Sequence, residues 1–147
     1  MSAYYDTGVL LKLYTEELDS EAAREFVTRR KAALCLTELH RSECVNALQL
    51  KRFRGECTEV QAAQALADVE EDLRAGVLRM AGLDWDAAWR SCRTLSLAHA
   101  LRTGCRTLDA LHVAGALQLG CREFVTADAR QGALARACRL KVINPLK

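Results

Sequence analysis

Short, wholly apolar segments alternate with longer segments of helical periodicity along the entire 147-residue chain. Between the apolar segments, apolar side chains recur three and four residues apart, which indicates amphipathic helices. Short strands without polar alternation are typical of a parallel sheet that is covered by helices on both faces. The sequence therefore predicts one α/β domain over residues 1–147, with three α/β/α layers and a five-stranded parallel sheet. The predicted strands are residues 3–5, 32–36, 77–80, 124–126 and 141–143.

Side chains that can cap a helix stand where the predicted helices begin. Thr37, Thr58 and Asp84 each precede a helical segment, and Thr107 precedes the segment that ends near Gly120. Such side chains accept hydrogen bonds from the first free backbone N–H groups of a helix, so they mark its start. The last predicted helix covers residues 127–137.

The composition indicates a globular protein with reduced cysteines. Half of the residues are apolar and 27% are charged, which is ordinary for a folded domain. The seven cysteines are scattered without a C-x-x-C pair, so they predict neither a disulfide framework nor a zinc ribbon. Asp6 and Lys12 interrupt the N-terminal apolar stretch, and no apolar segment is long enough to span a bilayer. We therefore expect a cytoplasmic protein that does not enter a membrane.

Four acidic residues follow predicted strands. Asp6 closes the first strand, and Asp128 comes two residues after the strand that ends at Thr126. Glu43 lies two turns into the helix after the second strand, and Asp109 lies in the first turn of the helix that starts at Thr107. Ligands of open parallel sheets bind beyond the carboxyl ends of the strands. We therefore expect the four carboxylates to meet at one edge of the sheet.

Each of these acids also has a structural interpretation. Acidic residues are favoured in the first turn of a helix, which would explain Asp109 and Asp128, and Glu43 would serve as a solvated helix residue. Asp6 is harder to explain in this way, because an unpaired charge after an apolar strand is costly to bury.

Taken together, the four acids indicate a metal site. Two carboxylates about 4 Å apart repel each other by roughly 4 kcal/mol at an effective dielectric constant near 20, so a fold gathers several only around a cation. Oxygen-rich sites suit Mg²⁺ or Mn²⁺, and such an ion activates water for attack on a phosphodiester.

The overall charge is compatible with a polyanionic substrate but does not require one. The formal net charge is only +2. If the four acids share a metal-loaded pocket, the remaining surface carries +6, and most of the cations are arginine. Arginine is well suited to bidentate contacts with phosphate, and Arg106 and Arg130 flank the predicted site. Their ordinary alternative is a solvated position beside a helix end.

Four blocks of the sequence resemble, in order, those of a PIN domain, and more narrowly those of VapC-type toxins of bacterial and archaeal toxin–antitoxin pairs. The blocks are SAYYDTGVLLKLY, TELHRSECVNAL, TLDALHVAGAL and EFVTADARQGALARACRLKVINP. The resemblance covers essentially the whole chain. It implies a nuclease that cuts RNA with Mg²⁺ or Mn²⁺, an antitoxin that covers the active site, and a homodimer.

The same resemblance assigns the site residues. The acidic quartet of the family corresponds to Asp6, Glu43, Asp109 and Asp128. Three further residues match positions that hydrogen-bond and orient the carboxylates, namely Thr7, Asn46 and Thr126. The sequence departs from the pattern at Gly8, where the family often has Ser, and at Gln131, where an acid is sometimes found. A housekeeping RNA-processing nuclease and a catalytically weak binding module remain alternatives.

The residues also allow two other interpretations. His112, three residues after Asp109, could face the site, but a packed or hydrogen-bonded histidine is the commoner role, and a metal-activated water makes a histidine base unnecessary. A receiver domain of a response regulator also has acids at strand ends. That fold needs an acidic pair after the first strand and a lysine at the last strand, whereas this chain has Asp6 alone and Asn144-Pro145.

Overall fold

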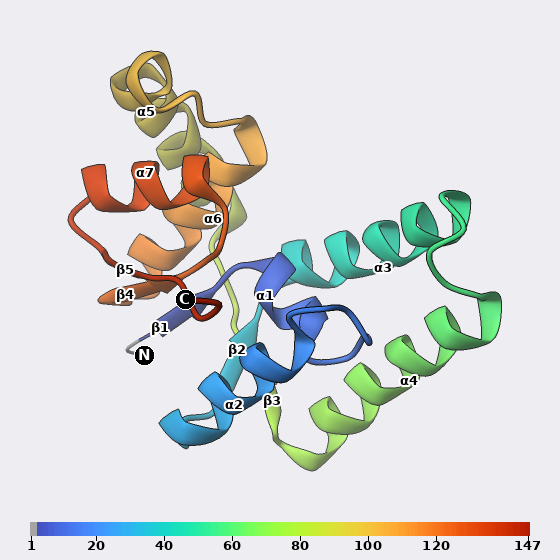
Figure 1. Cartoon of the computed structure of the whole chain (residues 1–147). Helices are drawn as coiled ribbons and strands as arrows, with labels where there is room; N and C mark the ends of the chain where they lie inside the picture. The colour runs from blue at the N-terminus through green and yellow to red at the C-terminus, as the bar shows by residue number, and fades with distance from the viewer. Residues whose placement is uncertain (1–2) are drawn as a thin grey trace. The chain divides into compact units, whose positions relative to one another are not determined.

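The computed structural model describes residues 3–147, and its helices and strands alternate as the sequence predicts (Figure 1). The strands are β1 (Ala3–Tyr5), β2 (Leu34–Leu36), β3 (Leu78–Met80), β4 (Glu123–Val125) and β5 (Lys141–Ile143). The helices are α1 (Thr7–Lys12), α2 (Ser20–Arg30), α3 (Glu38–Phe53), α4 (Glu59–Ala75), α5 (Trp85–Thr103), α6 (Thr107–Gln118) and α7 (Ala129–Ala137). Within residues 3–147, no helix is both long enough and apolar enough to cross a bilayer.

All strand pairs are parallel, as predicted, but the strands form two sheets instead of one. One sheet has the order β1-β4-β5 and the other pairs β2 with β3. In the first, Tyr4 is in register with Phe124, and Phe124 with Val142. The predicted five-stranded sheet is therefore wrong as a single hydrogen-bonded ladder. Apolar segments of three residues indicate buried parallel strands, but they do not determine which strand edges pair.

The chain divides into two compact units, which are described separately. The terminal unit comprises Met1–Asp6, Gly82–Pro145 and Lys147, and so contains β1, β4, β5 and α5 to α7. The middle unit comprises Thr7–Ala81 and Leu146, and contains α1 to α4 with β2 and β3. A single domain over residues 1–147 stays a prediction.

The core of the terminal unit forms where α6 packs beside the three-stranded sheet (Figure 1). Phe124 of β4 is fully buried, and its ring stacks on Tyr4 of β1 at 5.3 Å between centroids. Gly115 of α6 permits close packing, because a Cβ there would lie 3.2 Å from Leu83 Cδ1 and 3.5 Å from the Tyr4 hydroxyl. This packing holds the carboxyl end of β1, and hence Asp6, in a rigid setting.

The core of the middle unit lies among α1, α3 and α4. Leu11, Cys44 and Leu48 pack there against small residues of α4. Burial raises the pKa of the Cys44 thiol to about 11, and the negative charge of Glu43 adds to the effect. A thiol with so high a pKa is a poor nucleophile, so Cys44 acts here as a small apolar side chain.

Several predicted boundaries need correction by one or two residues. The strands predicted at 32–36 and 77–80 begin at Leu34 and Leu78. The helix assigned to a Thr107 cap has Arg106 as its N-cap residue. The strand predicted at 124–126 is Glu123–Val125, and the helix predicted to begin at residue 127 begins at Ala129. The last shift follows from Asp128, whose Oδ1 accepts a hydrogen bond from Gln131 N at 2.9 Å and so caps α7.

Candidate active site

Asp6 lies buried at the carboxyl end of β1, with 7% of its surface exposed. Its backbone N–H donates to Val125 O at 3.0 Å and so extends the pairing of β1 with β4. A buried carboxylate is stable only with hydrogen-bond partners. Thr126, directly after β4, supplies one of them, since its hydroxyl donates to Asp6 Oδ2. The first and last sequence blocks therefore meet at this bond.

Thr126 connects Asp6 to the start of α7. Its side chain is 2% exposed, and its Oγ1 accepts a hydrogen bond from Asp128 N at 3.0 Å. Gln131 is also buried, with its Oε1 atom 3.3 Å from the same hydroxyl oxygen. A hydroxyl has only one proton to donate, and the Asp6 carboxylate is the stronger acceptor.

Gln131 thus belongs to the group around Asp6, a role that the sequence analysis did not assign. From the sequence, Gln131 stands out only as a departure from a position where an acid is sometimes found. Asp128 and Gln131 stand at the N-cap and N3 positions of α7, and Gln is favoured three residues after a capping side chain. This spacing is the signal by which the sequence would have placed Gln131 at the N-terminus of α7.

Asp109 and Asp128 each cap the helix that carries them. Asp109 is half-buried, and its Oδ2 accepts a hydrogen bond from Arg106 N at 2.9 Å. Asp128 is exposed and accepts from Gln131 N through Oδ1. These are the structural roles expected for acids at helix N-termini. Each carboxylate still has a second oxygen that these two bonds do not use.

Glu43 belongs to the middle unit, on α3. Its Oε1 accepts a hydrogen bond of 2.6 Å from the hydroxyl of Thr7, the first residue of α1. Thr7 is buried and follows Asp6 directly in the sequence. This bond joins Thr7 to one of the four predicted acids, but the role of Thr7 in the site stays a prediction. Asn46 is exposed, and its side chain has no hydrogen bond with any other residue in the 3–147 range.

The chemistry of the predicted donors fits Mg²⁺ or Mn²⁺, because all four side chains offer carboxylate oxygens. However, the part of the chain from Ala3 onward contains no group of three or more His, Cys, Asp or Glu side chains close enough to hold a metal ion. Three of the acids are in the terminal unit and Glu43 is in the middle unit. Their gathering around one ion stays a prediction.

His112 is packed, in line with the commoner of its two interpretations. It is 2% exposed on α6, and its Nδ1 lies 2.7 Å from the hydroxyl of Tyr4. The two rings also meet edge to face, with 5.8 Å between their centroids. A histidine held between β1 and α6 in this way supports the core that positions Asp6.

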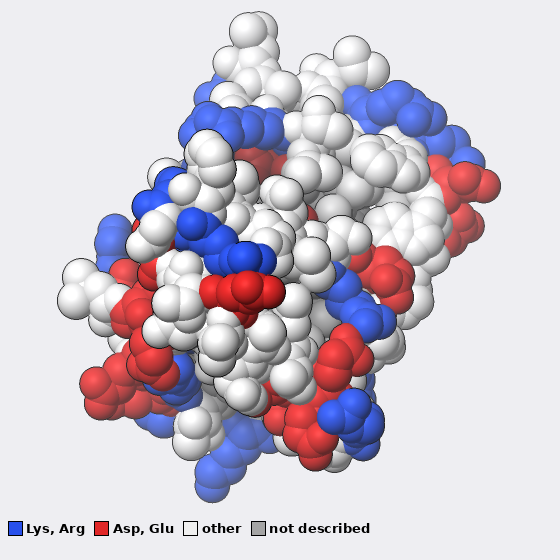
Figure 2. Space-filling model, turned by 90° about the vertical axis from the view of Figure 1, so that its right-hand side faces the viewer, with Lys and Arg blue, Asp and Glu red and all other residues white. Residues whose placement is uncertain are grey.

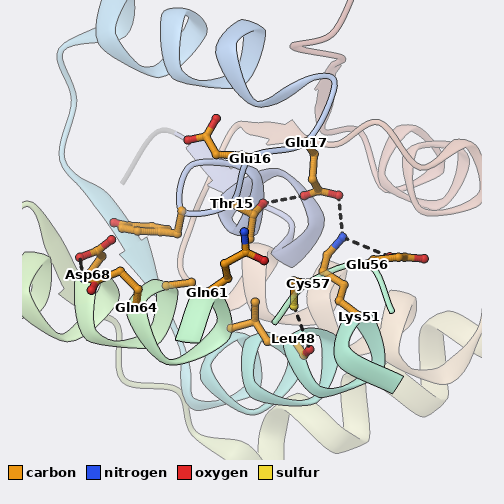
Figure 3. A pocket seen from close by; sticks show the side chains of 12 residues that line it. Thr15, Glu16, Glu17, Leu48, Lys51, Glu56, Cys57, Gln61, Gln64 and Asp68 are labelled. Carbon is orange, nitrogen blue, oxygen red and sulfur yellow. Dashed lines mark hydrogen bonds and ion pairs between the residues drawn. The ribbon is translucent and has the colours of Figure 1, made fainter. Parts of the chain in front are cut away.

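A cavity of about 290 Å³ lies in the middle unit and contains none of the predicted site residues (Figure 3). It is lined by the segment that follows α1 and by α3 and α4 with the loop between them, and Lys51 extends along one side toward Glu17 at 2.7 Å. Glu17 also accepts a 2.7 Å bond from Thr15. Burial alone would raise the pKa of Glu17, but the hydrogen bonds from Lys51 and Thr15 outweigh burial and lower it. The polar groups of this cavity are thus largely engaged with one another.

Comparison with known proteins agrees with this fold. The structure is similar to the crystal structure of FitAcB from Neisseria gonorrhoeae, with a TM-score of 0.60 over 97% of each chain and 16% sequence identity. At that identity the similarity concerns the fold alone. Among curated protein sequences, none matches this chain.

The family model of the PIN domain matches residues 3–137. Together with the structural similarity, this match confirms the predicted α/β/α fold class with parallel strands. It also spans most of the chain and includes all four predicted acids. The chain therefore belongs to the PIN domain family.

Proposed function

We propose that this protein is a metal-dependent endoribonuclease that hydrolyses RNA phosphodiester bonds, and that it is the toxin of a type II toxin–antitoxin pair. Its membership of the PIN family supports the hydrolase class, because PIN domains are typically nucleases. One observation carries the proposal. The Thr126 hydroxyl donates to the buried Asp6 carboxylate and accepts from Asp128 N, so residues from the first and last blocks are held together.

The residues that would hold Mg²⁺ or Mn²⁺ are Asp6, Asp109 and Asp128, through carboxylate oxygens. When bound, the ion supplies a more acidic water and compensates charge on the phosphodiester. Thr126 keeps the Asp6 carboxylate oriented through the hydrogen bond that its hydroxyl donates to Oδ2. Glu43 would bind or deprotonate the attacking water with the oxygen that Thr7 does not occupy. The expected products are a 5′-phosphate and a 3′-hydroxyl.

The direct test is cleavage of single-stranded RNA in Mg²⁺ by Asp6→Asn and Asp109→Asn. We expect each to cut at least about 100-fold more slowly, which corresponds to about 2.7 kcal/mol of lost transition-state stabilisation. Asp86→Asn is the matched control, because Asp86 is also an acid in the first turn of a helix of the terminal unit. Undiminished cutting by Asp6→Asn or Asp109→Asn would remove that residue from the mechanism.

A catalytically weak binding module is the second candidate function. It is favoured by the helix-capping roles of Asp109 and Asp128, which account for these acids without a metal. Calorimetric titration with Mg²⁺ and with Mn²⁺ distinguishes the candidates. Heat of binding that is absent from Asp6→Asn supports the nuclease, whereas no binding by the wild-type chain supports the module.

The toxin role is tested in cells. The resemblance to VapC-type toxins implies an antitoxin partner, a homodimer and a cytoplasmic site of action. We expect expression of the chain alone to arrest bacterial growth, and Asp6→Asn to remove this effect. Co-expression of a short neighbouring reading frame for a DNA-binding protein should restore growth. Normal growth with an active enzyme would favour a housekeeping nuclease. Light scattering on the purified chain tests the dimer.

A further inference from the structure

Among residues 3–147, the arginines of the terminal unit have no acidic partners. This unit contains eight arginines, all of them exposed, at positions 90, 93, 102, 106, 122, 130, 136 and 139. As far as the structure describes the chain, none of these guanidinium groups forms a hydrogen bond or an ion pair with another residue. Cations that the protein leaves unneutralised are available to an anionic ligand.

Three of these arginines lie together around one glycine, Gly104, which ends α5. Arg102 and Arg106 are each two residues from Gly104 in the sequence, so their Cα atoms lie within about 7.6 Å of its Cα. Arg130, on α7, packs over the same point, since its Cδ would lie 3.8 Å from a Cβ built on Gly104. A larger residue is disfavoured there because Gly104 has a φ of +68°. We call Arg102, Arg106 and Arg130 the arginine patch.

The arginine patch adjoins two proposed catalytic acids without being neutralised by them. Arg106 precedes Asp109 by three residues, and Asp128 precedes Arg130 by two. Both carboxylates instead accept backbone N–H groups at the starts of α6 and α7. Arg106 and Arg130 therefore stand, like the two acids, at the N-terminal ends of α6 and α7, where helix dipoles also favour anions.

We propose that the arginine patch binds the phosphate backbone of single-stranded RNA and holds it against the acids at the starts of α6 and α7. This inference rests on the proposed function. Because a ribonuclease binds RNA, we assign RNA, and not an acidic protein segment, as the ligand of the patch. The planar guanidinium group can bind two phosphate oxygens at once. Contacts of this kind position the strand without reading its sequence.

The experiment measures binding of a fluorescently labelled 12-nucleotide RNA of mixed sequence, in buffer without divalent ions so that no cutting occurs. The test variant is Arg106→Gln/Arg130→Gln. The control is Arg122→Gln/Arg139→Gln, which removes the same charge from the same unit. Arg122 and Arg139 precede the parallel strands β4 and β5, so they lie at the opposite edge of the sheet.

We expect the test variant to raise the Kd at least about 10-fold at 50 mM salt, and to reduce the slope of log K against log salt by about 1.4, for two lost phosphate contacts. The control should change the Kd less than about 3-fold. Equal weakening by both variants, or by neither, would overturn the inference. The inference would also be overturned if polyglutamate displaced the labelled RNA as strongly as unlabelled RNA does. That result would indicate that the patch binds acidic proteins.

Cleavage of the same RNA in Mg²⁺ separates this inference from the proposed function. If the test variant binds and cuts RNA like the wild type, the proposed role of the patch is wrong, while the proposed nuclease function is unaffected. RNA binding that depends on the patch, combined with undiminished cutting by Asp6→Asn, leaves the patch intact and ends the proposed mechanism. Unchanged thermal unfolding of both double variants shows that the fold is preserved.

Discussion

The two units of the chain use their charges in different ways. The terminal unit has ten lysines and arginines against six acids, a formal charge of +4, whereas the middle unit has eleven against thirteen, a charge of −2. In the middle unit, basic side chains contact acidic ones, as in the pairs of Arg41 with Glu70 and Lys51 with Glu17. Figure 2 shows acidic and basic side chains intermingled over much of one face.

The charged side chains therefore have different roles in the two units. Within the middle unit, charges stabilise one another and the local fold. In the terminal unit the arginines have no such partners among the residues that the structure describes. They therefore contribute little to folding and remain available for a ligand. The overall net charge of +2 conceals this division. Four sets of substitutions at core, buried polar and surface residues test it, in order of decreasing expected effect.

The largest effect tests whether the units unfold together. Leu48 and Leu134 are buried in the cores of the middle and terminal units. Leu→Ala at either position should lower the free energy of unfolding by about 2–5 kcal/mol, through lost burial and the cavity left behind. Both tryptophans, Trp85 and Trp89, lie in the terminal unit. If the chain is one domain, Leu48→Ala will shift urea unfolding followed by tryptophan fluorescence as much as that followed by circular dichroism.

Separate transitions would contradict that expectation. In that case the fluorescence midpoint would stay at the wild-type value in Leu48→Ala, while the circular dichroism curve would split. Such a result would show that the two units unfold independently of each other. Leu134→Ala is the matched control, because it must move the fluorescence transition in either case.

The next effect compares two threonine–carboxylate hydrogen bonds. Thr126 and Asp6 are both buried, whereas Glu43, the partner of Thr7, is only half-buried. Thr126→Val should lower the free energy of unfolding at pH 7 by about 1–3 kcal/mol, because Asp6 loses a donor away from water. Thr7→Val should cost less. Urea unfolding measures both, with Thr126→Ser as the control that keeps the hydroxyl. If Thr126→Val and Thr7→Val lowered the free energy of unfolding equally, burial of the bond would not determine its contribution to stability.

The sequence was sufficient to predict the class of fold and the order of its elements. Wholly apolar segments indicated each strand, and side chains such as Thr58 and Asp84 mark helix starts in the structure as well. It did not predict the division into two sheets, because the pairing of strand edges depends on tertiary packing. Apolar segments carry no record of that packing.

The sequence predicts which types of residue form the candidate site, but not the contacts between them. The positions of acids at strand and helix ends select Asp6 and Asp128 as candidates. The structure shows a hydrogen bond from Thr126 to Asp6, and the roles of these residues in a site stay predictions. The capping bond from Arg106 N to Asp109 was not predicted in detail, since acids at helix starts serve caps and metal sites alike. The cavity beside Lys51 is not predictable from the sequence, because its lining residues are spread over two helices and two connecting segments without a motif.

A smaller effect comes from the Lys51–Glu17 pair, which is partly buried in the middle unit. Lys51→Met keeps the apolar part of the side chain but removes the charge, and should cost about 1 kcal/mol at pH 7, between the values for exposed and buried pairs. The bond lowers the pKa of Glu17 in the folded state. This stabilisation is therefore fully present above about pH 4.3, the unfolded value, and is lost as the pH falls through the lower folded pKa.

Urea unfolding of wild type and Lys51→Met at pH 7 and pH 3 measures that dependence. We expect the difference between their free energies of unfolding to shrink at the lower pH, because protonated Glu17 no longer attracts Lys51. A difference that stays constant would assign the cost to lost packing. In that case the pair would not illustrate electrostatic stabilisation of the middle unit.

The smallest effect compares one surface arginine from each unit. Arg41 lies 2.5 Å from Glu70 and is about 38% exposed, whereas Arg122 of the terminal unit has no ion-pair partner among the described residues. Arg41→Gln should lower the free energy of unfolding by about 0.5 kcal/mol, the usual value for exposed pairs, and Arg122→Gln should leave it unchanged. In 1 M salt the two variants should converge, because exposed charges are then screened over about 3 Å. A larger loss for Arg122→Gln would show that the terminal arginines stabilise the fold after all, and that they are less available for a ligand than their lack of partners indicates.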